Sequence, residues 1–377
     1  MGISASIVLT TIYDPVALDD YYRNLKKFDR LSDVGIYMIP DLKTPDSAYK
    51  RCERLQKKGL NVVCPAVVEQ EEFLRKVGFD PHLVPCNSDN RRNVGFLMAL
   101  ESGADLIISI DDDNYCSEDE DFIACHEVVC GGRHTADVVS SQTGWYNICE
   151  LLNFAPQVKT YPRGFPYYAR HKKEQLDIVQ GGVTIHLNAG LWLQDPDVDG
   201  ISWLVNPAKA ISFRGKSPVL AQDTWTPINT QNTAMRRDVV CCYYYLKMGY
   251  PMEQMTIDRF GDICSGYFSQ ACIKAMKGSV RVGTPIAQHK RHSHNFFNDA
   301  ANEWGGIMVL EELLPWLTQE AQLIGSTYVE TYVCLSEILQ ENVERFKGKI
   351  WNDATRAYFH QMAFYMRKWA QVCKKLN

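Results

Sequence analysis

The sequence predicts an α/β fold, with a mostly parallel sheet flanked by helices and a helical C-terminal tail. Three observations lead to this prediction. Apolar runs alternate with amphipathic stretches through the first 110 residues, an acidic triplet directly follows one apolar run, and helical periodicity dominates after residue 310. Strands that alternate with helices indicate a parallel sheet covered on both faces.

The first 110 residues contain short apolar runs separated by stretches with helical spacing. A short apolar run indicates a buried strand, whereas apolar residues at intervals of three and four indicate a helix. A glycine after a periodic stretch, as at Gly59 and Gly103, is typical of a helix end. We therefore expect strands at residues 7–11, 34–39, 60–64 and 106–110, and helices at residues 19–29, 47–58 and 93–100.

The second half of the chain is less regular until its end. Residues 150–237 are rich in aromatic residues, glycine and proline, and their periodicity is weak, so we expect substrate-binding loops and edge strands there. A helix is expected at residues 262–277, followed by a strand near residues 280–286. We divide the chain into a catalytic domain, residues 1–310, and a helical extension packed on the core, residues 311–377.

Composition and charge exclude some classes of function. The chain has 377 residues and a formal net charge of −5, which gives no basic surface for nucleic acid. No run approaches about 18 consecutive apolar residues, so no membrane-spanning helix is expected. The first residues lack the pattern of a secretory signal. The 13 cysteines are scattered, and we expect reduced thiols in a cytoplasmic protein.

The acidic triplet Asp111, Asp112 and Asp113 follows the apolar run at residues 106–110. Ligands of open α/β sheets bind beyond the carboxyl ends of the strands. Three adjacent carboxylates repel one another unless a cation neutralises them, and hard divalent ions bridge carboxylates to phosphates. The triplet therefore predicts a site for Mn²⁺ or Mg²⁺ on a diphosphate. The alternative is a surface turn in which an aspartate caps a helix.

Two basic segments are candidates for phosphate binding. Arg91 and Arg92 precede the helix expected at residues 93–100, and arginines contact phosphate in a bidentate way. Later in the chain, Lys290 and Arg291 follow His289, whose imidazole is suited to complete a metal site made of carboxylates. The alternatives are a capped helix with exposed arginines and a histidine-rich surface loop.

Five segments and one histidine occur in a fixed order between residues 85 and 320. They are residues 110–113 (IDDD), 161–167 (YPRGFPY), 188–199 (NAGLWLQDPDVD), 227–238 (PINTQNTAMRRD) and 259–263 (RFGDI), and His289. Together they resemble the motifs of the plant reversibly glycosylated polypeptides, the UDP-arabinopyranose mutase family of the glycosyltransferase-A superfamily. The resemblance implies a glycosyltransferase-A fold.

The chain departs from the family motifs at several positions. Gly261 stands where the family has an aspartate, and residues 229–231 replace its Cys-Gly-Met triplet. His292 and His294 have no counterpart in the family motifs. These departures leave open the activity and the choice of sugar.

The residues and the resemblance together predict the binding groups. Asp111, Asp113 and His289 would hold the metal ion on the diphosphate. The nucleotide and its phosphates would be bound by Thr10, Arg91, Arg92, Asp111, Asp112, Lys290 and Arg291.

The same resemblance assigns two catalytic and two sugar-binding residues. Asp262 is predicted as a general base or hydroxyl clamp, and Arg163 as a contact of the diphosphate or the sugar. Trp192 and Asn232 are predicted to contact the sugar. The alternatives that stay open are helix capping for Asp262, a loop salt bridge for Arg163 and core packing for Trp192.

These observations predict a metal-dependent glycosyltransferase with a nucleoside diphosphate sugar, a UDP-sugar, as donor and an unknown acceptor. A first alternative is a UDP-sugar pyranose/furanose mutase, in which the sugar's own hydroxyl traps the anomeric carbon. A second alternative is a non-catalytic protein that binds sugar nucleotides. A nucleotidyltransferase would need a glycine-rich loop after the first strand, and residues 10–14 have none. The helical tail and the resemblance are compatible with a homo-oligomer.

Overall fold

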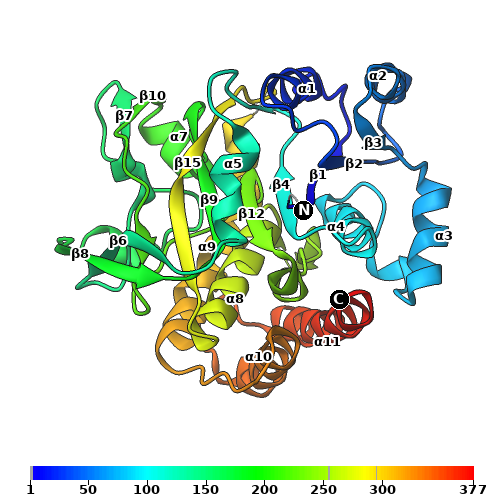
Figure 1. Ribbon diagram of the computed structural model, residues 1–377. Helices are drawn as coiled ribbons and strands as arrows, with labels where there is room; N and C mark the ends of the chain where they lie inside the picture. Colours follow the sequence, from blue (N-terminus) through cyan, green and yellow to red (C-terminus); the bar gives the residue numbers. More distant parts are fainter. Residues whose placement is uncertain (1–2, 254, 294) are drawn as a thin grey trace.

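The computed structural model describes residues 3–253, 255–293 and 295–377. Its centre is a 13-stranded mixed sheet with helices on both faces (Figure 1). The main path of the sheet has the spatial order β3-β2-β1-β4-β12-β9-β15-β11-β6-β8. The fold is of the glycosyltransferase-A type: a mixed sheet whose N-terminal strands are parallel, with flanking helices, followed by C-terminal helices.

The first 110 residues of the chain form one side of the sheet. Its four strands are parallel neighbours, so their carboxyl ends meet at one edge. The strands are β1 (Ala5–Thr11), β2 (Val34–Pro40), β3 (Asn61–Val63) and β4 (Leu106–Ile110). The helices between them are α1 (Leu18–Lys27), α2 (Asp46–Lys57), α3 (Val67–Val77) and α4 (Arg92–Glu101). All the strands and helices predicted here are confirmed, and α3 is an additional helix.

Close packing of α4 on the sheet explains one sequence feature. Gly95 lies so near the sheet that a Cβ atom on it would come 2.4 Å from the Cγ1 atom of Val8 and 3.0 Å from that of Ile39. Only glycine allows this approach without moving the helix. At the start of α4, Arg92 donates to the carbonyl of Ile110 at the end of β4, where the acidic triplet begins.

The middle of the chain supplies the rest of the sheet. Strand β12 (Asn232–Arg236) is antiparallel to β4 and to β9 (Ile185–Gln194), and β15 (Ser279–His289) is parallel to β9. The outer strands are β11 (Val219–Leu220), β6 (His134–Ser141) and β8 (Leu176–Val183). The expectation of only loops and edge strands at residues 150–237 was wrong, because β9 and β12 lie in the centre of the sheet.

A short strand brings the acidic triplet to a distant part of the chain. Strand β5 (Asn114–Tyr115) follows the triplet and pairs with the end of β15, where Asn114 stands opposite His289. The smaller elements around this region are β7 (Leu152–Ala155), β10 (Lys209–Phe213), β13 (Tyr250–Met252), β14 (Met255–Ile257), α5 (Phe122–His126), α6 (Tyr167–Arg170) and α7 (Gly200–Val205).

The C-terminal helices pack on the core. They are α8 (Gly261–Ala275), α9 (Phe296–Gln319), α10 (Tyr328–Asn342) and α11 (Asp353–Leu376). Helices α10 and α11 pack against each other, and α10 also contacts α8 whereas α11 contacts α4 (Figure 1). Trp369 of α11 is fully buried, and its Nε1 donates to the Val240 carbonyl at 3.2 Å. The division at residue 310 stays a prediction, and α9 runs through that residue.

None of the described helices combines the length and the apolarity that crossing a lipid bilayer requires. The cytoplasmic location stays a prediction.

Candidate active site

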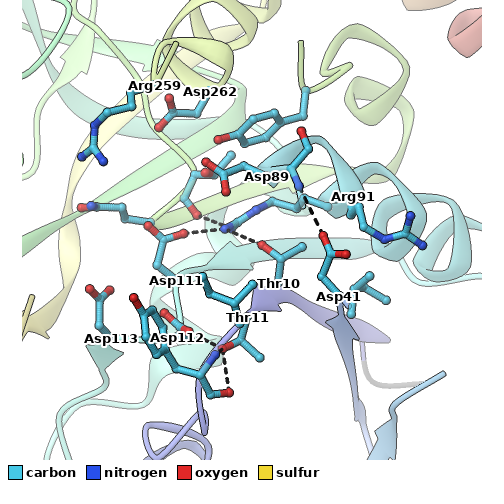
Figure 2. Close-up of a pocket in the computed structure, with 18 of the residues that line it drawn as sticks. Thr10, Thr11, Asp41, Asp89, Arg91, Asp111, Asp112, Asp113, Arg259 and Asp262 are labelled. Atoms are coloured by element: carbon cyan, nitrogen blue, oxygen red, sulfur yellow. Dashed lines mark hydrogen bonds and ion pairs between the residues drawn. The ribbon is translucent and has the colours of Figure 1, made fainter. Parts of the chain in front are cut away.

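A cleft of about 310 Å³ opens at the edge of the sheet where the parallel strands end. At one end, Thr10, Thr11 and Asp41 lie at the carboxyl ends of β1 and β2, next to the acidic triplet (Figure 2). The far end is lined by Arg163, Asp197, Arg259, Asp262, His289 and Arg291. The cleft therefore lies at the carboxyl edge of the sheet, where the sequence predicted that ligands bind.

Asp111 is tied to an arginine. Its Oδ1 accepts from Arg92 Nη2 at 2.6 Å. Burial and the neighbouring Asp113 together raise the pKa of Asp111 to about 6, although Arg92 acts in the opposite direction. Arg92 also donates to the carbonyl of Ile110 at 2.7 Å, so it fixes the end of β4 as well as the Asp111 carboxylate.

The other two carboxylates of the triplet face histidines. Asp112 accepts a hydrogen bond from the Thr11 hydroxyl through Oδ2, and its Oδ1 lies 3.6 Å from His292 Nε2. Asp113 Oδ2 lies 3.4 Å from His289 Nε2. Burial opposes the charge of Asp113, but the hydrogen bond and the positive charge of His289 outweigh it and lower the pKa of Asp113.

His289 is held in one tautomer. Its side chain is only 3% exposed, and its Nδ1 lies 2.6 Å from the carbonyl oxygen of Asp195. A carbonyl oxygen can only accept, so Nδ1 carries the proton and Nε2 is the nitrogen that faces Asp113. An imidazole so close to a carboxylate needs either a second proton or a cation between the two groups. This is the arrangement found at metal-binding histidines, whose second nitrogen is anchored by the protein.

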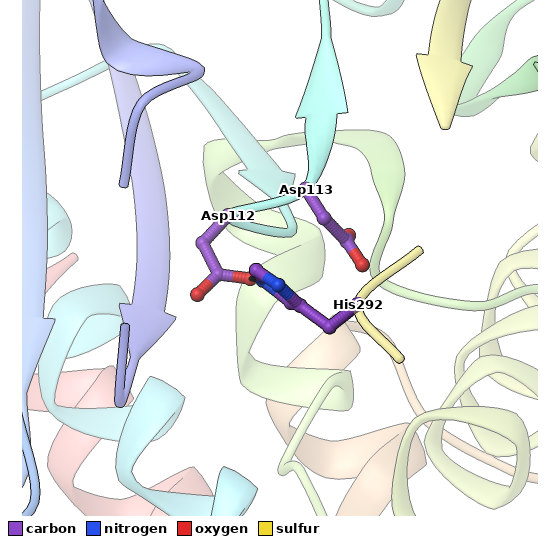
Figure 3. Close-up of side chains that lie close together, drawn as sticks. All are labelled: Asp112, Asp113 and His292. Atoms are coloured by element: carbon purple, nitrogen blue, oxygen red, sulfur yellow. Dashed lines mark ion pairs between the residues drawn. The ribbon is translucent and has the colours of Figure 1, made fainter. Parts of the chain in front are cut away.

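The described residues contain one group whose side chains could together hold a metal ion. It consists of Asp112, Asp113 and His292, whose ligand atoms all lie within 4.8 Å of one another (Figure 3). His292 Nε2 is buried and has no hydrogen-bond partner. The ligands predicted from the sequence were Asp111, Asp113 and His289, so the two sets share Asp113.

A buried ion-pair network closes the far end of the cleft. Arg163 Nε donates to Asp197 at 2.9 Å, and its Nη2 donates to Asp262 at 2.8 Å. None of the three side chains is more than 9% exposed. Burial opposes the charge of Asp197, but the charge and hydrogen bonds of Arg163 outweigh it and lower the pKa of Asp197. Arg163 therefore fixes two carboxylates that line the cleft.

Asp262 is the second residue of α8. Its carboxylate pairs with Arg163, and no side chain caps this helix. The alternative reading of Asp262 as a helix cap is therefore wrong. The other alternative, an ion pair for Arg163, describes the contacts that Arg163 makes.

Three predicted phosphate-binding residues have other partners. The Arg91 guanidinium bonds to Gln70 Oε1 at 3.0 Å and points away from the acidic triplet (Figure 2). Arg92 lines the cleft, but its guanidinium already donates to backbone carbonyls and pairs with Asp111. Lys290 does not line the cleft, and its Nζ lies 4.4 Å from the centre of the Tyr115 ring. Thr10 and Arg291 do line the cleft.

The two predicted sugar contacts lie behind the wall of the cleft. Trp192 is 1% exposed and belongs to the main hydrophobic core. Asn232 is fully buried, and its Nδ2 donates to the carbonyl of Pro285 at 2.8 Å. Its Oδ1 lies 3.0 Å from His126 Nε2. The structure thus brings neither residue to the cleft.

Several residues that line the cleft were missed from the sequence. Asp41 follows β2 just as Asp111 follows β4, and that position at a strand end could have identified it from the sequence. Asp89 precedes α4 and lies two residues before the predicted Arg91, and burial raises the pKa of its carboxyl. Arg259 has a left-handed backbone, with φ of 57°, and its Nε donates to Glu303 at 3.1 Å. The only sequence feature that could have identified Arg259 as a cleft residue was its place in the RFGDI segment.

The fold and the cleft define an enzyme of the glycosyltransferase-A type. Residues 59–377 match the family model described as reversibly glycosylated polypeptide, and the chain belongs to this family. The resemblance inferred from the motifs is thereby confirmed.

The chain is similar to UDP-arabinopyranose mutase 2 of Arabidopsis thaliana, with 25% identity over 279 residues that cover 72% of this chain and 69% of that protein. It is also similar to UDP-arabinopyranose mutase 3 of the same plant, with 24% identity over 324 residues that cover 80% of each. Among solved structures, Staphylococcus aureus TarS 1-349 in complex with UDP-GlcNAc matches with a TM-score of 0.42 and 11% identity, over 99% of this chain and 90% of that chain.

Proposed function

We propose that this protein is a metal-dependent glycosyltransferase with a UDP-sugar as donor. The observation that carries the proposal is the meeting of Asp113 with the buried His289 inside the cleft, at the carboxyl edge of the sheet. Ligands of open α/β sheets bind at this edge. Membership of the family, and relatives named UDP-arabinopyranose mutases, support a UDP-sugar as the ligand.

Asp113 and His289 are the residues that we propose for holding Mn²⁺ or Mg²⁺. The donor set fits, because it joins a carboxylate oxygen to an imidazole nitrogen whose tautomer Asp195 fixes. Such an ion, when bound, neutralises the charge that develops on a departing diphosphate. Asp111 was predicted as a further ligand. Because its Oδ1 pairs with Arg92, we propose that it orders the strand end instead.

The base and ribose of the nucleotide are proposed to lie at the end of the cleft formed by β1 and β2. Thr10, Thr11 and Asp41 offer hydroxyl and carboxylate groups there. Asp41 accepts from two backbone N–H groups, those of Leu42 at 2.7 Å and Ser88 at 3.3 Å, which hold its carboxylate in place. A fixed carboxylate of this kind can accept from the N–H of a base or from a ribose hydroxyl.

The sugar is proposed to lie at the far end, beside Asp197 and Asp262. In the transfer, the bond between the anomeric carbon and the β-phosphate oxygen breaks, and the acceptor hydroxyl oxygen bonds to that carbon. The acceptor's proton passes to a carboxylate, for which Asp262 is our candidate. Arg163 acts as a positioning residue, because its two ion pairs hold Asp197 and Asp262.

A second candidate function is a pyranose/furanose mutase acting on a UDP-sugar. The names of the relatives favour it, and the same residues serve it, because the reaction also begins with cleavage of the anomeric bond. In the mutase the sugar's own hydroxyl attacks the anomeric carbon. The β-phosphate oxygen then bonds to that carbon again while the original ring oxygen leaves it as a hydroxyl, which gives the UDP-furanose. The acceptor and the presence of a homo-oligomer stay predictions.

The test is to incubate the protein with Mn²⁺ and UDP-pentose or UDP-hexose, without acceptor, and to separate the products by chromatography. A UDP-furanose product establishes the mutase, whereas slow release of UDP that is accelerated by sugar acceptors establishes the transferase. The Asp113→Ala variant should lose either activity, and Asp119→Ala, in an exposed acidic run, is the matched control. UDP binding that is unchanged in Asp113→Ala, without turnover of the wild type, would argue for the non-catalytic alternative.

A further inference from the structure

One carboxylate that lines the cleft has no role in the proposed mechanism. Asp89 makes no side-chain hydrogen bond or ion pair within the part of the chain that the structure describes. An ionised carboxylate only accepts hydrogen bonds, so Asp89 is free to accept from a ligand in the cleft. The other aspartates that line the cleft are all held by the protein; they are Asp41, Asp111, Asp112, Asp113, Asp197 and Asp262.

Asp89 belongs to the part of the cleft between the acidic triplet and Asp262. Figure 2 shows it between them in that view, and Asp262 marks the end proposed for the sugar. Burial and the negative charge of Asp262 raise the pKa of Asp89, against the positive charge of Arg92, so these groups are within electrostatic reach of one another. The backbone before Asp89 is fixed, because the Ser88 N–H donates to Asp41 at 3.3 Å.

Tyr245 offers a second unused polar group in the cleft. The residue is 5% exposed and lines the cleft, and its hydroxyl has no hydrogen bond to any residue that the structure describes. Its backbone N–H donates to Asn93 Oδ1 and its carbonyl accepts from Asn93 Nδ2, both at 2.9 Å, so the start of α4 holds it in place. Burial and the charges of Asp89 and Asp262 raise the pKa of Tyr245, so the hydroxyl keeps its proton and can donate.

The Tyr245 ring fits in the wall of the cleft because residue 261 is a glycine. A Cβ atom at Gly261 would lie 2.7 Å from Cε1 of Tyr245 and 2.6 Å from the Leu246 carbonyl oxygen. A larger side chain there would therefore displace the ring. Gly261 is also a position at which the chain departs from the family motifs. That departure makes room for Tyr245.

We propose that Asp89 and Tyr245 select the sugar of the sugar nucleotide: the Asp89 carboxylate accepts from a sugar hydroxyl, and the Tyr245 hydroxyl donates to a sugar oxygen. This inference rests on the proposed UDP-sugar function. Both side chains line the cleft with unused hydrogen-bonding groups, within electrostatic reach of Asp262. A site built to bond a hydroxyl rejects a sugar that lacks it, because the polar group of the protein is then left unpaired.

Calorimetry with Mn²⁺ measures the binding of UDP, UDP-glucose and UDP-arabinopyranose. Asp89→Asn should weaken binding of the sugar nucleotides about tenfold or more, and Tyr245→Phe about three- to tenfold. Binding of UDP alone should change less than about twofold, because UDP lacks the sugar. Asp119→Asn and Tyr22→Phe are the matched controls, because neither residue lines the cleft.

Monodeoxy analogues of the tighter-binding sugar nucleotide identify the hydroxyl that Asp89 contacts. In the wild type, loss of that hydroxyl should weaken binding about tenfold. In Asp89→Asn the same loss should weaken binding less than about threefold, because the contact is already absent. If Asp89 only stabilised the fold, each deoxy analogue would lose the same affinity in the variant as in the wild type.

Two outcomes would overturn this assignment while leaving the proposed function intact. One is that both variants melt at the wild-type temperature and bind the sugar nucleotides as tightly as the wild type. The other is an equal weakening of UDP and of the sugar nucleotides, which would mean that Asp89 and Tyr245 contact the nucleotide. A wild-type protein that binds no sugar nucleotide would contradict the proposed function itself.

Discussion

At the scale of single residues, the site consists of charges that the protein holds in place before any ligand binds. Arg92 holds Asp111, Asp195 holds the ring of His289, and Arg163 holds Asp262. Buried groups of this kind are costly to leave without their partners. Because no group needs to reorient when charge develops, such a site is suited to stabilising a departing diphosphate.

The ion pair of Arg92 with Asp111 gives a first prediction. Arg92→Ala leaves a carboxylate and the Ile110 carbonyl without their donor, and should lower the free energy of unfolding by about 3–5 kcal/mol. Urea denaturation measures this. Arg75→Ala, which removes an exposed ion pair, should cost less than about 1 kcal/mol. Equal effects of the two substitutions would contradict the role given to Arg92.

The buried His126 gives a prediction for pH. Burial lowers the pKa of His126 to about 3, so the folded protein binds fewer protons than the unfolded chain between about pH 3 and 6.5. Its contribution to stability is therefore fully present above pH 6.5 and is lost as the pH falls, by up to about 1.4 kcal/mol per pH unit. Urea denaturation from pH 7 to 4.5 should show a shallower loss in His126→Gln. Parallel curves would show that His126 does not titrate in this way.

At the scale of secondary-structure elements, the site depends on three approaches: α4 to β1, β5 to β15, and α8 to the loop that carries Arg163. The first is local enough to be read from the sequence, because apolar runs predicted β1 and β4 and helical spacing predicted α4. The other two join residues far apart in the chain. Asn114 meets His289, and Arg163 meets Asp262. The hydrophobic periodicity of the sequence does not reveal contacts between residues so far apart in the chain.

The missed strand β9 and the two wrong sugar contacts have physical explanations. Strand β9 was missed because its buried positions include His186 and Asn188, whose polar groups have partners inside the protein, so the segment lacks the apolar run of a central strand. Trp192 and Asn232 were predicted as sugar contacts because their segments resemble the family motifs. Their depth behind the cleft depends on which face of the sheet each side chain takes.

Gly95 gives a prediction at this scale. Gly95→Ala should favour helix formation by about 1 kcal/mol, but the added methyl group would meet Val8 and Ile39 and force α4 away from the sheet. We expect a net loss of about 1–3 kcal/mol, measured by urea denaturation. Gly132→Ala is the control, because nothing lies within 4 Å of its added Cβ. A stabilised Gly95→Ala variant would contradict the close packing.

At the scale of the whole molecule, the C-terminal helices and the central sheet share one hydrophobic core. That core contains Trp369 and Met366 of α11 together with Leu97 and Leu100 of α4. Because the cleft begins at the start of α4, the helical tail supports the site without touching it. The molecule is therefore expected to unfold as one cooperative unit.

Trp369→Ala tests this expectation. The ring is fully buried and packs edge-on against Phe79, so its loss should cost about 3–5 kcal/mol. The loss of helix, followed by circular dichroism, and the loss of UDP binding should move to lower temperature together. If the helical signal melted at a lower temperature while UDP binding persisted, the tail would be an independent unit.

The central claim is that Asp113 and His289 hold a divalent cation against the diphosphate of a sugar nucleotide. Anomalous diffraction from crystals grown with UDP and Mn²⁺ tests it most directly. The account predicts one Mn²⁺ peak within about 2.5 Å of both the Asp113 carboxylate and His289 Nε2, next to the phosphates. UDP bound in the cleft without Mn²⁺ at this position would contradict it.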